Sequence, residues 1–125
     1  MCQERLRRIA IADGSPAFLT AAADYIAALP GYVLAGTADT ALQAPALVTS
    51  AGPDVLLLDL GRPSAPGLEM VRRLKSTPGA PAVVAMTLFH TPETAAAAQH
   101  AGADALVGKE SFVSGLSQAL ARLFP

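Results

Sequence analysis

The chain has 125 residues, of which 52% are hydrophobic and 15% are charged, and its formal net charge is −1. This length fits one domain with a substantial core, and the near-neutral charge without a basic run argues against direct binding of nucleic acid. Cys2 is the single cysteine, which excludes an intramolecular disulfide, and the absence of a signal-peptide core or a membrane-spanning run favours a cytoplasmic location.

The first half of the chain predicts two strand–helix units. Residues 8–13 predict a strand, and Ser15 followed by Pro16 is typical of a helix N-terminus. Residues 32–38 predict a second, thinner strand. A short helix should follow it, with a late start or a distorted first turn because of Pro45.

A continuous apolar run from Val55 to Leu58 organises the rest of the chain. A run without polar interruption is typical of a central parallel strand that helices cover on both faces. Asp59 ends the run and Gly61 and Pro63 break it, so we expect Asp59 where the strand passes into a loop. Ligands bind at this carboxyl edge in open parallel sheets. The alternative role for Asp59 is to cap the turn that follows.

The second half of the chain continues the alternation. An amphipathic helix is predicted around Leu68 to Leu74, followed by a strand over residues 82–87. Thr91-Pro92-Glu93 is a helix-start signal, and a short strand over residues 103–108 should follow that helix. We expect a last helix, capped by Ser111, with an apolar stripe formed by Phe112, Leu116, Leu120 and Leu123.

Strand–helix units of this length predict an α/β fold, specifically a three-layer, doubly wound (βα)5 flavodoxin-like sandwich. Its five-stranded parallel sheet should have the order 2-1-3-4-5. Every strand except the second ends in a polar group, and these groups would meet at one edge: Asp13, Asp59, Thr87 and Lys109. Two carboxylates, a hydroxyl and an ammonium suit a site for Mg²⁺ and a phosphoryl group. Each residue also has a structural alternative, as a helix cap, a strand end or a loop lysine.

Several segments occur in one register along the chain: Ile11 to Pro16, Pro53 to Asp59, Gly61 to Glu69, Val84 to Thr87, and Ala101 to Lys109. Together they make the chain resemble the receiver domain of response regulators, the CheY-like phosphorylation module of two-component signalling. The resemblance covers residues 6–124, and Glu110 after Lys109 makes it most similar to the LuxR/NarL-type branch. We expect a single receiver domain over residues 1–125, with no output domain in this chain.

The resemblance implies a role for each residue at the strand ends. Asp59 is the phosphoacceptor for a histidine kinase, a phosphotransfer protein or a small donor, Thr87 bonds the phosphoryl group, and Lys109 pairs with it. Mg²⁺ is held by Asp13, Asp59 and the backbone carbonyl of Gly61. The domain then switches a surface that controls a partner or a helix-turn-helix output domain outside this chain. It is not an enzyme beyond phosphorylation from small donors and dephosphorylation of itself, and homodimerisation stays open.

Four positions depart from the family pattern: Gly14, Arg62, Leu88 and Leu106. Gly14 stands in place of a second acid, so we expect weakened Mg²⁺ binding. Arg62 is read first as an exposed loop residue, and alternatively as a cation that pairs with phosphate in partial replacement of the metal. Leu88 should narrow access to Asp59, and Leu106 replaces the aromatic residue of the family's switch. The alternative function is therefore a pseudo-receiver, an interaction module that keeps the fold and is poorly phosphorylated or not phosphorylated.

Overall fold

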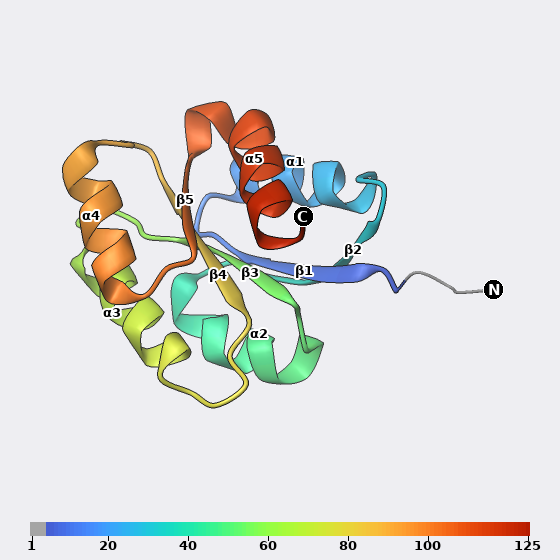
Figure 1. Ribbon diagram of the computed structural model, residues 1–125, viewed down its shortest axis with the longest axis horizontal. Coiled ribbons are helices and arrows are strands. Elements are labelled where there is room, and N and C mark those ends of the chain that lie inside the picture. The colour runs from blue at the N-terminus through green and yellow to red at the C-terminus, as the bar shows by residue number, and fades with distance from the viewer. Residues whose placement is uncertain (1–4) are drawn as a thin grey trace.

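Five parallel strands form one sheet in the predicted order β2-β1-β3-β4-β5 (Figure 1). The computed structural model describes residues 5–125, and Cys2 lies outside the described residues. The strands are β1 (Arg7–Ala12), β2 (Tyr32–Ala38), β3 (Val55–Asp59), β4 (Ala82–Thr87) and β5 (Ala105–Gly108). The helices are α1 (Pro16–Ala27), α2 (Ala44–Ala51), α3 (Ala65–Lys75), α4 (Pro92–Ala101) and α5 (Phe112–Leu123). Over residues 5–125, no helix is both long and apolar enough to cross a membrane.

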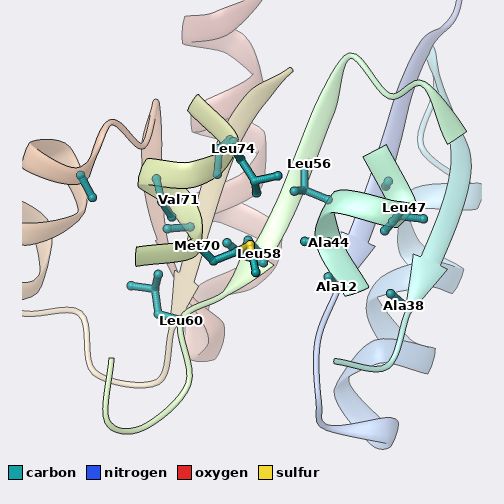
Figure 2. Packing of buried hydrophobic residues seen from close by; sticks show 14 of the residues in the cluster. Ala12, Ala38, Ala44, Leu47, Leu56, Leu58, Leu60, Met70, Val71 and Leu74 are labelled. Atoms are coloured by element: carbon teal, nitrogen blue, oxygen red, sulfur yellow. The ribbon is translucent and has the colours of Figure 1, made fainter. Parts of the chain in front are cut away.

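Helices cover both faces of the sheet, with α1 and α5 on one side and α2, α3 and α4 on the other (Figure 1). Successive residues of β3 therefore belong to two cores. Val55 and Leu57 pack with α1 and α5, whereas Leu56 and Leu58 pack with the helices of the opposite face. Figure 2 shows Leu56 and Leu58 directed toward side chains of α2 and α3. All of these β3 side chains are fully buried, which confirms the predicted three-layer sandwich.

The start of α3 lies directly against the end of β3. A Cβ on Gly67 would overlap the carbonyl oxygen of Leu60 and lie 2.5 Å from its Cα. Only glycine permits this approach of two backbones. The loop from Leu60 to Ser64, which follows Asp59, is consequently short and is fixed at both ends.

Three local predictions can be compared with the structure. Pro45 lies in the first turn of α2, which begins late after a 3-10 turn over Ala41–Gln43, as expected. The last strand begins at Ala105 rather than at residue 103, because the Asp104 carboxylate accepts a hydrogen bond from the Val83 backbone N–H and occupies a turn. Ser111 stands at the N-cap position of α5, as predicted, but its side chain makes no capping hydrogen bond. A 3-10 turn over Lys109–Ser111 leads into the helix.

Candidate functional site

The polar residues predicted at the strand ends do lie at one edge of the sheet. Asp13 directly follows β1, Asp59 is the last residue of β3, Thr87 is the last residue of β4, and Lys109 directly follows β5. The structure brings Asp13, Asp59 and Lys109 into one ionic cluster. The Thr87 hydroxyl lies in the same region but is engaged elsewhere, with the backbone of Phe89.

Lys109 is the centre of this cluster. Its Nζ lies 2.8 Å from Asp13 Oδ2 and 3.7 Å from Asp59 Oδ1, and the side chain is only 7% exposed. The ammonium also lies 4.3 Å from the centroid of the Phe18 ring of α1, a cation–π contact. These contacts hold the lysine beside both carboxylates and exclude the alternative of a solvated loop lysine.

Asp13 makes two kinds of contact: a hydrogen bond within the turn that opens α1, and an ion pair within the cluster. Its Oδ1 accepts a 2.8 Å hydrogen bond from the Ser15 backbone N–H, in the turn that opens α1. Its Oδ2 is buried, forms the ion pair with Lys109, and accepts no hydrogen bond from the described residues. That oxygen therefore depends on Lys109 for its charge balance within the cluster.

Asp59 lies where its negative charge is disfavoured. Burial is the largest cause that raises the pKa of its carboxyl group, and the neighbouring Asp13 charge raises the pKa further. Lys109 and a 3.3 Å hydrogen bond from the Gly61 backbone N–H oppose this rise, but the net pKa is above the ordinary value. An ionised oxygen with a raised pKa is a stronger base than an ordinary aspartate, which suits a nucleophile.

A pocket of about 270 Å³ opens beside Asp59. Its lining includes three of the positions that depart from the family pattern, and the full set is Gly14, Ser15, Asp59, Gly61, Arg62, Leu88 and Lys109. Leu88 is half exposed and contributes to the pocket wall, in the place where it was expected to narrow access. Arg62 is exposed, as first interpreted, and its guanidinium carbon lies 4.5 Å from the centroid of the Phe89 ring.

The oxygen atoms around this pocket fit Mg²⁺ in kind. The chain offers the carboxylates of Asp13 and Asp59 and the carbonyl of Gly61, whose positive φ of 75° turns the backbone sharply after Asp59. Mg²⁺ in proteins is commonly held by one or two carboxylates together with water. Within residues 5–125, however, no group of three acidic, histidine or cysteine side chains converges on one point. The donor set is compatible with Mg²⁺ and has one carboxylate fewer than the family pattern, because Gly14 stands in place of a second acid.

Several contacts of this site were missed from the sequence. Lys109 rests on the ring of Phe18, and nothing in the spacing of Phe18 along the chain indicates this contact. The second strand was judged to offer no polar group, yet Asp39 directly follows β2. Its carbonyl oxygen lies 3.8 Å from where a Cβ on Gly14 would stand, so that position has room for a side chain.

Comparison with known proteins agrees with this geometry. Residues 9–121 match the family described as the response regulator receiver domain. A LuxR-family two-component response regulator from Aurantimonas sp. SI85-9A1 superposes with a TM-score of 0.83 at 28% identity, over 95% of this chain and 85% of that chain. The receiver domain of NarL from Mycobacterium tuberculosis has a TM-score of 0.82 at 22% identity, over 94% of each chain, which shows the same fold.

The relatives in sequence are longer proteins. A protein of Pseudomonas aeruginosa described as a transcriptional regulator is 30% identical over 111 residues, which are 89% of this chain and 53% of that protein. Protein-glutamate methylesterase/protein-glutamine glutaminase 2 of Cereibacter sphaeroides is 34% identical over 114 residues, which are 90% of this chain and 31% of that protein. The chain thus spans between about a third and about half of the length of these relatives. With the family match across most of the chain and the sheet order that it requires, this protein belongs to the response regulator receiver domains of two-component systems.

Proposed function

We propose that Asp59 accepts a phosphoryl group from a histidine kinase or a phosphotransfer protein in the cytoplasm, and that the domain works as a phosphorylation switch. The observation that carries this proposal is the position of Lys109. Its ammonium lies 3.7 Å from Asp59 Oδ1 at the wall of an open pocket, where it can pair with an oxygen of an incoming phosphoryl group.

Each residue of the site has a role in the proposed reaction. The Asp59 carboxylate attacks phosphorus, the P–N bond to the donor imidazole breaks, and its electron pair stays on that nitrogen, which leaves an aspartyl phosphate. Asp13, Asp59 and the Gly61 carbonyl would hold Mg²⁺, which when bound supplies positive charge near the phosphoryl oxygens. Lys109 neutralises one oxygen, and Thr87 has to give up its contacts with Phe89 before its hydroxyl can bond another.

The output lies on the surface formed by β5, α4 and α5, where Leu106 replaces the usual aromatic. A groove of about 620 Å³ crosses this surface between His90 and Arg122. The longer relatives support an output domain or a partner protein that lies outside the chain, of which a DNA-binding domain is one kind. On this proposal the chain is a switch, with phosphorylation from small donors and dephosphorylation of itself as its own chemistry.

The second candidate is the pseudo-receiver, and Gly14 is the observation that favours it. One carboxylate fewer leaves two acids for the metal, and hard cations depend on the charge of their ligands. Such a module would keep the fold and bind its partner without efficient phosphorylation.

Intact mass after incubation with acetyl phosphate and Mg²⁺ tests both candidates. The switch predicts one added phosphoryl group on the parent, none on Asp59→Asn, and a reduced amount on Asp13→Ala. An unlabelled parent, under conditions that label an ordinary receiver domain, would overturn the switch and leave the pseudo-receiver. Circular dichroism of each variant shows whether a lost signal reflects lost folding.

A further inference from the structure

The pocket beside Asp59 is short of positive charge for a phosphoryl group. Before phosphorylation, Lys109 lies against two carboxylates, Asp13 and Asp59. Phosphorylation removes the Asp59 charge but adds a group with a charge of roughly −1.5 to −2, by analogy with other phosphorylated side chains. Lys109 already offsets the buried Asp13, so most of the new charge has to be balanced by Mg²⁺ on a weakened donor set or by another cation.

Arg62 is the cation that the structure supplies. It lines the same pocket as Asp59 and Lys109, and it directly follows Gly61, whose left-handed backbone turns the chain beside the carboxylate. Among the described residues, no carboxylate lies within 4.0 Å of its guanidinium. Its described contact is the Phe89 ring, at 4.5 Å. An exposed stack of this kind is weak, so a charged oxygen competes with it easily.

Phe89 contacts both of the side chains that would bind the phosphoryl group, Arg62 and Thr87. Its ring carries Arg62, and its backbone N–H donates a 3.1 Å hydrogen bond to the Thr87 hydroxyl oxygen. The Thr87 hydroxyl also lies 3.4 Å from the Phe89 carbonyl oxygen, to which it donates. In the unphosphorylated chain, Arg62 and Thr87 are therefore both engaged by the same residue, Phe89.

We propose that Arg62 pairs with the phosphoryl group on Asp59 in partial replacement of the missing carboxylate–metal charge, and that Phe89 is the latch that holds Arg62 until then. This inference rests on the proposed phosphorylation of Asp59. Phosphorylation breaks the contact of Arg62 with the Phe89 ring and the hydrogen bonds of Thr87 with the Phe89 backbone. Because both sets of contacts belong to Phe89, their loss loosens the β4–α4 loop. The guanidinium fork suits this role because it donates two parallel hydrogen bonds to phosphate oxygens.

The test measures how phosphorylation depends on Mg²⁺. Parent, Arg62→Gln and Arg73→Gln chains are incubated with acetyl phosphate over a range of Mg²⁺ concentrations, and the phosphorylated fraction is read by intact mass. Arg73 is the matched control, because it is an exposed arginine of α3 that does not line the pocket. We expect Arg62→Gln to raise the Mg²⁺ concentration for half-maximal phosphorylation roughly tenfold, the size of one charge-assisted hydrogen bond, and Arg73→Gln to leave it unchanged.

Two further variants separate the parts of the proposal. Phe89→Ala frees Arg62 and should raise the phosphorylation rate at limiting Mg²⁺. Gly14→Asp returns a carboxylate to a position with room for it, so it should lower the Mg²⁺ requirement and make the Arg62→Gln effect smaller in the double variant. A readout without turnover is the NMR spectrum: beryllofluoride with Mg²⁺ should shift the Phe89 ring and Arg62 Nε–H resonances in the parent.

The outcomes of the two proposals are distinguishable. A parent that is never labelled, at any Mg²⁺ concentration, contradicts the phosphorylation of Asp59 itself. A labelled parent in which Arg62→Gln and Arg73→Gln respond alike to Mg²⁺ overturns the role of Arg62 and leaves the switch intact. Beryllofluoride-induced shifts that leave Phe89 and Arg62 unmoved would equally overturn the latch.

Discussion

Asp59 carries a charge that the folded chain disfavours. Its side chain is 19% exposed, and it shares its surroundings with the buried carboxylate of Asp13. Burial is the largest cause that raises the pKa of its carboxyl group, and Asp13 is the second. Lys109 lowers this pKa, but by less than these two causes raise it.

Replacing Asp59 by asparagine should therefore stabilise the fold at neutral pH, in buffer without divalent cations. Because the folded pKa lies above the unfolded one, the folded state binds more protons between the two values, and the stability of the parent falls as pH rises through that window. The advantage of Asp59→Asn should be largest at the upper end of the pH range and shrink as pH falls toward about 4, near the ordinary aspartate pKa. Urea unfolding from pH 4 to pH 8 measures it, with Asp24→Asn, an exposed change on α1, as the control. A parent more stable than Asp59→Asn at pH 7 would contradict the argument.

Lys109 should be the most costly polar residue of the site to remove. It is 7% exposed and faces Asp13, which has no exposed surface, so Lys109→Met leaves a buried carboxylate without its cation. Loss of one partner of a buried pair typically costs about 3 to 5 kcal/mol of unfolding free energy. Adding Asp13→Asn should recover part of that loss, because both charges are then gone. If the double variant is less stable than Lys109→Met alone by guanidinium unfolding, the pair is not what stabilises this edge.

At the scale of elements, Lys109 is held by a contact with a helix that lies far from it in sequence. Lys109 rests on Phe18 of α1, whose ring packs edge-on against Phe112 of α5 at 5.2 Å. Phe112 packs in turn against Tyr25 at 6.0 Å. On the proposed function, a shift of Lys109 toward a phosphoryl group would disturb its contact with Phe18, at the point where α1 meets α5. The Asp59 loop is fixed differently, by the backbone contact between Gly67 and Leu60.

Gly67→Ala tests that contact between elements. Its new Cβ would meet the backbone of Leu60, which cannot move without displacing the end of β3, so we expect a loss of about 2 to 3 kcal/mol. Gly115→Ala on α5 is the matched control. Its Cβ would stand 2.9 Å from Val107 Cγ1, so it would meet a side chain and not a backbone, and the helix propensity of alanine, about 1 kcal/mol better than that of glycine, offsets part of the cost. Thermal and urea unfolding should rank Gly67→Ala well below Gly115→Ala, and equal stabilities would refute the close approach.

At the scale of the whole molecule, the hydrophobic pattern of the sequence predicted the fold but not the side-chain contacts in the loops. The unbroken apolar run of β3 predicted a strand covered on both faces, and parallel strands necessarily bring Asp13, Asp59 and Lys109 to one edge. Thr87 was placed correctly at its strand end, yet its hydroxyl turns toward Phe89. Such choices depend on loop residues that have no period, which is also why the stack of Arg62 on Phe89 was not predicted.

The three-layer architecture makes a prediction about neighbouring residues of one strand. In a sheet with one solvent-exposed face, truncation lowers the free energy of unfolding strongly at every second residue and weakly at the residues between. Here Leu57 and Leu58 face different cores, and neither has exposed surface. Leu57→Ala and Leu58→Ala should each lower the free energy of unfolding by about 2 to 5 kcal/mol, the range for cavities left by buried leucines. Leu42→Ala is the control, because that side chain is 80% exposed and its truncation should change little. Denaturant unfolding of the three variants decides the matter: a loss below about 1 kcal/mol at either β3 position would mean that one face of the sheet is not a packed core.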